Sequence, residues 1–495
     1  MKLRDVLAGA SVAEWPADPG VEVTGLAYSS SGVQEGTLFF CVPGARADGH
    51  DFAPAALEAG ASALVVERPL ELDVPQAVVA DARATMAPAA VAFYRDPTAE
   101  LQVAGITGTN GKTTTSFLLR HLLERSGVQT GQLGTIVQVV GGTESEVERT
   151  TPEAIDLQRT FREMLDSGDR ACAMEVSSHA LALRRADGVR FAAATFTNLT
   201  QDHLDFHAGM EDYFDAKSRL FAGTPDPPAA SIVNVDDPYG ARLAEDLDQR
   251  GAPVRTISAE GARVADYAAV DVSFDAGGSR FTCRSPDGEH LVELGLPGLF
   301  NVSNALAAIA TAGALGVGAL EATASLTDAD RVPGRMEPID EGQSFAVLVD
   351  YAHTPDSLEN VLRAARKITQ GRLICVFGAG GDRDSDKRPL MGAAVATGAD
   401  LALVTSDNPR SEDPDAIVAQ IRGGMNGDGA TAEIEVQVDR RAAIAAALST
   451  AEAGDTVVIA GKGHEQGQEF ENGRKLPFDD RDVAREELRA LLAAT

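Results

Sequence analysis

The chain has 495 residues, 44% of them hydrophobic, and 74 acidic against 43 basic residues give it a formal net charge of −31. This length is too great for one hydrophobic core, so we expect several domains. A field this negative disfavours nucleic acid and anionic membranes as partners. The four cysteines form no CxxC pair and indicate neither a disulfide framework nor a zinc site. Without a signal-peptide pattern or an apolar run of membrane-spanning length, the sequence predicts a cytoplasmic protein with no membrane insertion.

The first part of the chain predicts a small α/β domain. Strand-like segments alternate with one Ala-rich helical stretch: strands at 37–42, 63–66 and 77–79, and a helix at 52–59. Asp96-Pro97-Thr98 then marks a linker. We therefore place the first domain at residues 1–98.

The segment Gly105-Ile-Thr-Gly-Thr-Asn-Gly-Lys-Thr-Thr-Thr115 predicts a phosphate-binding loop, because it follows an apolar run and opens a helical pattern. In such a loop the backbone N–H groups and the helix N-terminus face the phosphates. Lys112 would neutralise phosphate oxygens, and the Thr113 hydroxyl can hold Mg²⁺. The usual pattern has a glycine where Ile106 stands, so we expect a variant loop. The residues predicted to bind ATP are Gly108, Thr109, Asn110, Gly111, Lys112, Thr113 and Thr114.

Polar residues follow two further strands of the middle region. Glu175 follows the apolar run at 171–174, a position where nucleotide-binding sheets place a carboxylate linked to Mg²⁺. The segment 198–207 follows the next strand and carries Asp202, His203, Asp205 and His207. For this segment a metal-binding role and a structural role are equally supported.

Lys217 lies in an unusual place for a lysine. Helical spacing over 211–222 puts it on the same face as Tyr213, Phe214, Leu220 and Phe221, with no acid four residues before or after it. Such a lysine either extends its ammonium to solvent or is buried for chemistry. The pattern alone favours neither.

The tail of the middle region predicts strands at 269–274 and 278–284 and a helix at 301–314, before a hinge at 332–335. We therefore expect a middle domain at 99–333 and a last domain at 334–495. In the last domain, helical patterns separate four apolar runs at 345–349, 373–377, 401–404 and 456–460. This alternation predicts a doubly wound parallel sheet.

A polar loop follows each of these four strands, at 350–356, 380–384, 407–410 and 461–465. Ligands of open α/β sheets bind at the carboxyl ends of the strands, so we expect the loops to meet at one edge. Their arginines can bind carboxylates and their acids an ammonium, which suits a zwitterionic ligand. Ordinary turn chemistry could explain one such loop but hardly all four.

Five motifs together resemble those of the Mur ligases, the ATP-dependent amino-acid ligases of peptidoglycan precursor synthesis: Gly-Thr-Asn-Gly-Lys-Thr-Thr-Thr, Glu-Val-Ser-Ser-His, Asn-Leu-Thr-Gln-Asp-His-Leu-Asp, Tyr-Ala-His-Thr-Pro-Asp and Gly-Lys-Gly-His-Glu. The resemblance spans essentially the whole chain. It implies three α/β domains: an N-terminal domain that binds a UDP-linked substrate, a central P-loop ATPase with a mainly parallel sheet, and a C-terminal Rossmann-like, doubly wound amino-acid domain.

The resemblance also implies roles for individual residues. Asn301, Asn304 and Arg335 would contact ATP, while Thr113, Glu175 and His203 would hold Mg²⁺. Lys217 matches a carbamylated lysine (N6-carboxylysine) of the family. The UDP-muramoyl dipeptide would be held by Ser30, Thr150, Thr151, Ser177 and Arg185, although Ser29-Ser30-Ser31 stands where many members have Asp-Ser-Arg. The residues implied to contact meso-diaminopimelate are Arg383, Asp407, Asn408, Pro409, Arg410, Gly461 and Glu465.

The implied reaction is the ATP-dependent addition of meso-diaminopimelate to UDP-MurNAc-L-Ala-D-Glu through an acyl phosphate, by a monomeric enzyme. Lys112, Lys217 and His353 would be catalytic, with His353 or a carboxylate as the base for the amine. Among related enzymes, Asp407-Asn-Pro-Arg410 disfavours a lysine-adding ligase, and the long N-terminal domain disfavours a folylpolyglutamate synthetase. A nucleotide-dependent switch or binding protein is the alternative from another class, and it would hydrolyse ATP without the other substrates.

Overall fold

The computed structural model describes residues 1–44, 47–147, 149–222, 227–262, 264–275, 277–427 and 429–494. The chain forms two compact units, and each is built from several segments. The first unit comprises Met1–Thr107, Gly127–Thr195 and Ala216–Ser231, and the second comprises Gly108–Ser126, Phe196–Asp215 and Ile232–Thr495. The boundaries expected at residues 98 and 333 stay predictions.

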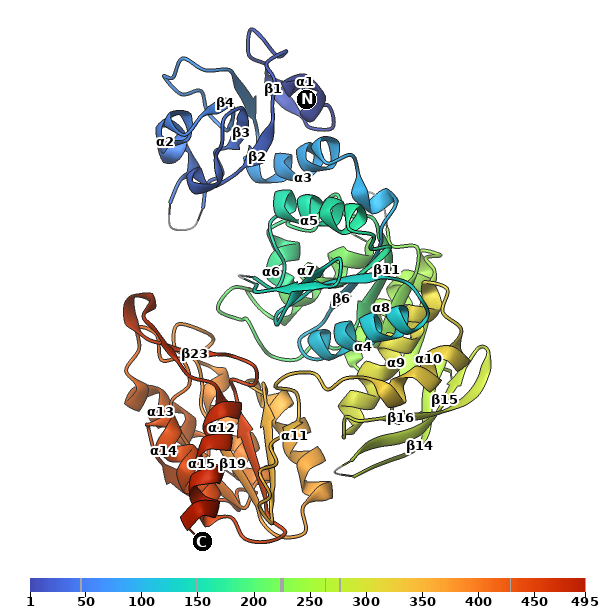
Figure 1. The fold of residues 1–495 in the computed structure, drawn as a ribbon, viewed down its shortest axis with the longest axis vertical. Helices are drawn as coiled ribbons and strands as arrows, with labels where there is room; N and C mark the ends of the chain where they lie inside the picture. The colour runs from blue at the N-terminus through green and yellow to red at the C-terminus, as the bar shows by residue number, and fades with distance from the viewer. Residues whose placement is uncertain are drawn as a thin grey trace. The chain divides into compact units, whose positions relative to one another are not determined.

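The first sheet of the first unit is five-stranded and mostly parallel (Figure 1). Its elements are β1 (Val12–Glu14), β2 (Gly25–Ala27), β3 (Thr37–Phe40), β4 (Ala61–Val66) and β5 (Gln76–Val79), with helices α1 (Leu3–Val6), α2 (Ala53–Glu58) and α3 (Ala82–Phe93). The strand order is β1-β5-β4-β3-β2, and only β1 pairs in the antiparallel direction. Alternate side chains of β3 enter two apolar clusters, Leu38 and Phe40 in one and Phe39 in the other, so the strand is buried on both faces.

The second sheet of this unit contains the strand that leads to the phosphate-binding loop. Its elements are β6 (Gln102–Thr107), β7 (Thr130–Leu133), β8 (Gln138–Val140), β9 (Thr143–Ser145), β10 (Ala171–Glu175) and β11 (Phe191–Phe196), with helices α5 (Ala154–Asp166) and α6 (Ser178–Ala182). β6 and β7 both pair with β10 in parallel. β6 continues through the fully buried Ile106, and therefore the loop begins only at Gly108. This explains why position 106 carries no glycine.

The second unit starts with this loop, at Gly108, and the helix that follows it. Its elements before the hinge are α4 (Lys112–Arg125), β12 (Ser231–Asn234), α8 (Pro238–Gln249), β13 (Val254–Ser258), β14 (Tyr267–Asp275), β15 (Gly278–Ser285), β16 (Gly288–Leu294), α9 (Leu299–Ala314) and α10 (Ala319–Ser325). The helix α7 (Met210–Ala222) contributes residues to both units. β13 and β14 are parallel, whereas β14, β15 and β16 form an antiparallel meander. The Ala-rich α9 packs against α4, and this packing places α9 beside the loop.

The last part of the second unit is the predicted doubly wound parallel sheet (orange to red in Figure 1). Its strands are β17 (Glu337–Pro338), β18 (Ala346–Asp350), β19 (Leu373–Phe377), β20 (Leu401–Val404), β21 (Glu433–Val436) and β22 (Thr456–Ala460). Its helices are α11 (Pro355–Ile368), α12 (Lys387–Gly398), α13 (Pro414–Gly423), α14 (Arg440–Thr450) and α15 (Asp480–Ala494), and the hairpin β23 (Gly467–Glu469) and β24 (Lys475–Pro477) precedes α15.

The order β17-β18-β22-β19-β20-β21 is parallel except for β17. Helices α11, α12 and α13 cover one face, and α14 and α15 cover the other. Because β18, β22, β19 and β20 are parallel neighbours, their carboxyl ends lie at one edge, and the prediction that the four polar loops meet there is confirmed.

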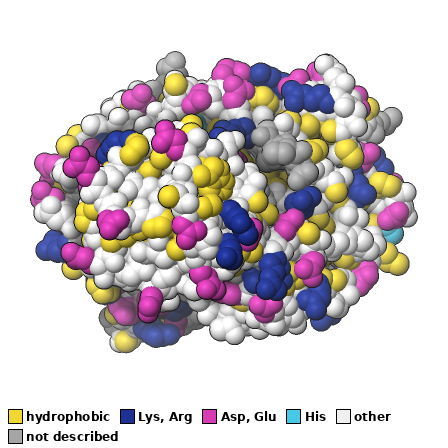
Figure 2. Space-filling view, turned by 90° about the horizontal axis from the view of Figure 1, so that it is seen from above, with side chains coloured by type: hydrophobic (Ala, Val, Ile, Leu, Met, Phe, Trp, Pro, Cys, Tyr) yellow, Lys and Arg dark blue, Asp and Glu magenta, His cyan; other side chains and the backbone are white. Residues whose placement is uncertain are grey.

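Charged side chains of both signs lie on the surface. Figure 2 shows a face on which Asp and Glu side chains are spread among Lys and Arg.

In the part of the chain that the structure describes, no helix is long and apolar enough to cross a membrane. All four cysteines are buried and free.

Candidate active site

The loop between β6 and α4 is held open by two glycines. Gly108 has φ +152° and Gly111 has φ +87°, conformations that residues with a side chain rarely adopt. A Cβ at Gly108 would also collide with the Thr197 hydroxyl, and one at Gly111 would collide with the Asn304 side chain. Lys112 Nζ donates to the carbonyl oxygens of Gly108 at 3.0 Å and Thr109 at 2.8 Å. The ammonium is therefore held against the loop that is predicted to bind phosphate.

The segment 197–200 is bonded directly to this loop. The Asn110 N–H donates to Asn198 Oδ1 at 2.9 Å, and the Thr197 hydroxyl donates to Asn110 O at 2.6 Å. The Thr109 hydroxyl donates to Thr200 O at 3.1 Å. Hydrogen bonds thus join two motifs that are about 90 residues apart in the sequence. His203 follows three residues after Thr200, in the second of these motifs.

The three predicted Mg²⁺ ligands are divided between the units, with Glu175 in the first and Thr113 and His203 in the second. Glu175 is fully buried at the end of β10, and its two carboxylate oxygens accept hydrogen bonds from the N–H and hydroxyl of Thr135. Thr113 Oγ1 accepts a hydrogen bond from Arg335 Nη2 at 3.1 Å. Carboxylate and hydroxyl oxygens are the donors that Mg²⁺ prefers, so Glu175 and Thr113 fit the ion in type, whereas the imidazole of His203 is a ligand more usual for transition metals. Among the described residues, no cluster of three or more His, Cys, Asp or Glu side chains could itself hold a metal.

The expected carbamylated lysine and the expected adenine contacts are buried. The side chain of Lys217 lies on the interior face of α7, and the residue is only 1% exposed. Of the two alternatives for Lys217, the structure therefore supports burial and not extension of the side chain to solvent. On α9, Asn304 Nδ2 donates to Asn301 Oδ1 at 3.3 Å, and Asn301 Nδ2 donates to Pro297 O at 2.9 Å. Together with the approach of Asn304 to Gly111, these bonds place both amides beside the nucleotide loop.

The hinge residues touch both the nucleotide loop and the C-terminal loops. Arg335 donates to Thr113, and its guanidinium carbon lies 4.4 Å from the centre of the Tyr351 ring. Gly334 has φ +63° and lies so close to the backbone of Gly463 and His464 that a Cβ would collide with both. The hinge is therefore packed against the loop 461–465.

A buried ionic network surrounds the candidate base His353. Asp202 Oδ1 accepts from Lys387 Nζ at 3.0 Å, and Asp202 Oδ2 lies 3.8 Å from His353 Nε2. Burial alone would raise the pKa of Asp202, but Lys387, His203 and His353 beside it hold the pKa well below its usual range. Burial lowers the pKa of His353, and the nearby Lys387 lowers it further.

The tautomer of His353 follows from its contacts. His353 Nδ1 lies 2.8 Å from the carbonyl oxygen of Tyr351, and a carbonyl oxygen only accepts hydrogen bonds. Nδ1 therefore carries the proton, and Nε2 of the neutral ring has a free electron pair that can take a proton. This arrangement supports His353 as a base, and its neighbour Lys387 had no predicted role.

The predicted amino-acid contacts at 407–410 and 461–465 are joined to each other. Asn408 Nδ2 donates to Glu465 Oε2 at 2.8 Å, and Lys462 Nζ donates to both Asn408 Oδ1 and Glu465 Oε2. Gly461 has φ +118°, and a side chain there would meet the Asp407 carboxylate. These loops form a single polar cluster at the edge of the sheet.

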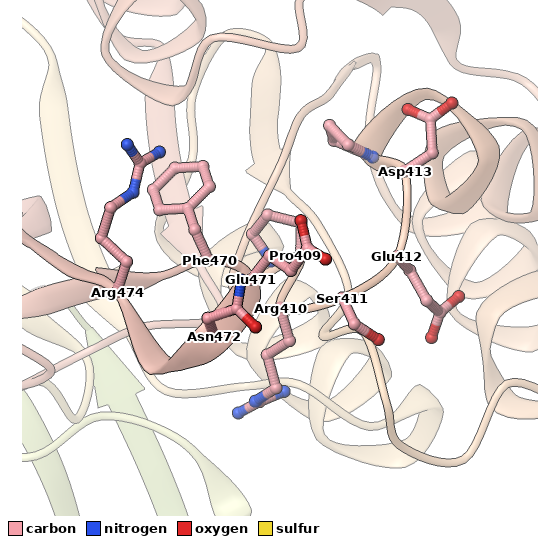
Figure 3. A pocket seen from close by; sticks show the side chains of 10 residues that line it. Pro409, Arg410, Ser411, Glu412, Asp413, Phe470, Glu471, Asn472 and Arg474 are labelled. Carbon is pink, nitrogen blue, oxygen red and sulfur yellow. The ribbon is translucent and has the colours of Figure 1, made fainter.

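Two predicted arginine contacts lie at the margin of this cluster. Arg410 donates from Nε to Glu469 Oε2 at 2.8 Å and from Nη1 to Gly381 O at 2.7 Å. Arg383 donates to Asp382 O at 3.0 Å and is exposed. Arg410 also lines a cavity of about 730 Å³ between Pro409 and the tip of the β23–β24 hairpin. Figure 3 shows the guanidinium groups of Arg410 and Arg474 pointing in different directions, so they do not converge on one anion in this cavity.

Four of the five residues predicted to hold the UDP-linked substrate lie together in the first unit. The Thr151 hydroxyl donates to Glu175 O at 2.9 Å and accepts from Ser177 N at 3.1 Å. Thr150 Oγ1 lies 3.1 Å from Thr135 Oγ1, and Arg185 Nη1 donates to Thr151 O at 3.4 Å. The fifth, Ser30, lies in a short 3₁₀ turn of the N-terminal sheet region.

Several charged side chains that fix these positions were not predicted from the sequence. Glu153 is buried under three arginines, Arg83, Arg149 and Arg185, at 2.9, 3.3 and 3.0 Å. Lys462 and Glu469 organise the amino-acid loops. Lys462 gave a signal in the sequence, since a lysine two residues after the apolar strand 456–460 and between two glycines has no solvated helix face to occupy. Glu153 and Glu469 gave none, because Arg83 and Arg185, which pair with Glu153, and Arg410, which pairs with Glu469, come from distant segments.

Comparisons with known proteins agree with this arrangement. The chain matches three family profiles: "Mur ligase family, catalytic domain" at residues 22–103, "Mur ligase middle domain" at 106–312 and "Mur ligase, glutamate ligase domain" at 334–463. It is 48% identical to a UDP-N-acetylmuramoyl-L-alanyl-D-glutamate--2,6-diaminopimelate ligase of Streptomyces coelicolor, over 95% of this chain and 94% of that protein. It is 45% identical to the protein of that name from Geobacillus kaustophilus, over 94% of each.

Solved structures are similar as well. A structure of a UDP-N-acetylmuramoyl-L-alanyl-D-glutamate--2,6-diaminopimelate ligase matches with a TM-score of 0.67 and 32% identity, over 99% of both chains. A MurF from Acinetobacter baumannii also matches with a TM-score of 0.67, over 99% of this chain and 98% of that one, but at 19% identity it reports on the fold alone.

Proposed function

Because the chain belongs to the Mur ligase family, we propose that it adds meso-2,6-diaminopimelate to UDP-N-acetylmuramoyl-L-alanyl-D-glutamate, with ATP as the energy source, in peptidoglycan precursor synthesis. The observation that carries this proposal is the direct connection between the nucleotide loop and the amino-acid loops. Asn110 Nδ2 donates to Asp356 Oδ2 at 3.0 Å, and Arg335 links Thr113 to the region of Tyr351. An amide-forming ligase needs such a connection, because the activated acid must meet the amine.

The chemistry follows from the need to activate a carboxylate. An amine does not displace hydroxide from a carboxylate at neutral pH, so the γ-phosphoryl group of ATP first passes to the substrate carboxylate. That step brings anions together, and each like-charge pair at about 4 Å costs about 4 kcal/mol at an effective dielectric constant near 20. Lys112 and the N–H groups of the loop offset this repulsion. The amine then attacks the acyl phosphate, and the tetrahedral intermediate collapses to amide and phosphate.

The attacking amine has to be neutral, whereas model α-amines have a pKa near 8. His353 Nε2 can accept the proton, since its Nδ1 proton is already engaged by the Tyr351 carbonyl. Asp202 lies next to this nitrogen and would stabilise the protonated ring. His353 is therefore our candidate for the base.

Thr113, Glu175 and His203 would hold Mg²⁺, which when bound neutralises phosphate charge. A carbamate on Lys217 would turn a buried cation into an anion that can orient the ion. We place the enzyme in the cytoplasm as a monomer.

The test is a screen of amino acids for phosphate release in the presence of ATP and UDP-MurNAc-L-Ala-D-Glu. We expect release only when diaminopimelate is present, with amide product in equal amount. Preferential release with lysine would instead identify a lysine-adding ligase, and release with a folate in place of the UDP substrate would identify a folylpolyglutamate synthetase. ATP hydrolysis that needs neither co-substrate would contradict the proposal and support a switch protein.

A further inference from the structure

Lys462 is a buried cation among the amino-acid loops. Its residue is fully buried, and its ammonium donates to Asn408 Oδ1 at 2.9 Å and to Glu465 Oε2 at 2.8 Å. It also lies 3.9 Å from Asp407 Oδ1. An ammonium removed from water needs such partners, and here all three belong to the predicted amino-acid contacts.

These contacts fix the orientation of the Asn408 amide. Asn408 Oδ1 accepts from Lys462 Nζ and from the N–H of Glu469 at 2.9 Å, so its Nδ2 must face Glu465. Without Lys462, the amide oxygen would lose one of its two donors, and the Glu465 carboxylate would lose its nearest cation. Lys462 therefore helps to hold the polar atoms that the two loops present.

The charge of Lys462 acts mainly on the amino-acid loops. Arg440, a second buried cation nearby, is bonded to the buried Asp480 at 2.6 Å, so part of its charge is offset by its own partner. Burial alone would raise the pKa of Asp407, but Lys462, followed by Arg440, His353 and Arg410, lowers it. Asp407, Glu465 and Glu469 surround the place where the amino acid is expected, and Lys462 reduces the negative field that they produce.

We propose that Lys462 is a positioning residue that makes this site prefer an amino acid with a second carboxylate. The proposal rests on the proposed function. The far end of diaminopimelate carries an ammonium and a carboxylate, whereas the far end of lysine carries an ammonium alone. Three carboxylates attract either ammonium, but they repel the extra carboxylate. By offsetting them, Lys462 allows Arg410 and Arg383 to bind that carboxylate.

The experiment compares Lys462→Met with the unsubstituted protein, using diaminopimelate and lysine as alternative amino acids. We expect the ratio of kcat/KM for diaminopimelate to kcat/KM for lysine to fall by about tenfold or more, since hydrogen bonds to charged groups contribute at about this level. The KM for ATP should change by less than about twofold. Lys2→Met, at an exposed lysine near the start of the chain, is the matched control and should keep the ratio unchanged.

A merely structural role would lower activity with both amino acids equally and leave the ratio intact, and that result would overturn the proposal. If Lys462→Met does not fold, as judged by thermal unfolding and ATP binding, Lys462→Met combined with Glu465→Gln removes the uncompensated charge. This double variant is compared with Glu465→Gln alone, and equal ratios in the two would again overturn the proposal. Failure of the proposed function looks different, because the unsubstituted protein would then form no product with diaminopimelate.

Discussion

The nucleotide loop and the amino-acid loops of the second unit hold their lysines in opposite ways. Lys112 donates to two carbonyl oxygens within four residues of itself. Lys462 donates to side chains of Asn408 and Glu465, one of which is 54 residues away. Lys112 is held by backbone carbonyl groups of its own loop, and Lys462 is held by a network of buried polar and charged side chains. Backbone geometry is set by a short motif, whereas a charge network depends on the whole sheet edge.

This difference predicts that substitutions should separate into two classes. In the nucleotide loop they should affect phosphoryl transfer, whatever amino acid is offered. At the sheet edge they should affect the amino acid and leave ATP binding unchanged. The hinge, which touches both regions, should affect both.

The largest effect is expected for Lys112→Ala. The loop would keep its shape, because the glycines and the bonds to 197–200 remain, but the cation for the phosphates is lost. We expect kcat to fall by at least about 100-fold with an unchanged unfolding temperature, measured by phosphate release and calorimetry. Substantial turnover in this variant would show that the loop does not act as a phosphate cradle.

A smaller but broader effect is expected for Gly334→Ala. The new Cβ would collide with Gly463 and His464 at a residue with φ +63°, so the hinge would move away from the loop 461–465. Strain of about 1–3 kcal/mol corresponds to roughly 5- to 150-fold in kcat/KM for both ATP and diaminopimelate.

Gly342→Ala provides the control for this hinge variant. Gly342 has φ +97°, but nothing lies within 4 Å of the place where its Cβ would be. This variant therefore carries backbone strain without the collision. Equal losses in the two variants would mean that strain alone, and not contact with the loop 461–465, explains the hinge effect.

The sequence predicted the parts that depend on contiguous motifs better than the parts that depend on long-range charge networks. The strands 373–377, 401–404 and 456–460 were predicted with their observed bounds, because continuous apolar runs between helical patterns identify buried parallel strands. The phosphate loop was predicted from one contiguous motif, and the family was predicted correctly. The start of the loop was less clear, since Ile106 reads as loop in the motif but pairs as strand.

The networks could not be predicted in this way. Lys387 was not singled out because its partner Asp202 is 185 residues away, and no local pattern marks such a pair. The Arg440–Asp480 pair is fully buried, yet in the sequence both residues look like ordinary surface charges at helix N-termini. Long-range ion pairs depend on which strand ends are neighbours, and only the fold supplies that order.

At the sheet edge, Arg410→Ala should act on one substrate only. Its guanidinium is held by Glu469 and Gly381, and its removal takes away a predicted carboxylate contact. We expect the KM for diaminopimelate to rise by about tenfold or more, with the KM for ATP unchanged. Arg474→Ala, across the cavity in Figure 3, is the control and should have little effect. A parallel rise in both KM values would undermine the separation of the two regions.

The smallest effect is expected for Lys387→Met, and it should appear as a shift in pH dependence. Burial lowers the pKa of His353 and Lys387 lowers it further, while Asp202 acts in the opposite direction. A base acts only when deprotonated, so kcat/KM should decline as the pH falls through the pKa of His353. Removing Lys387 leaves Asp202 to favour the protonated ring, which raises this pKa and moves the acid limb to higher pH. The measurement is kcat/KM for diaminopimelate against pH at saturating ATP. If the acid limb stayed at the same pH or moved to lower pH, His353 would not be the group that takes the proton, and a carboxylate would then be the better candidate.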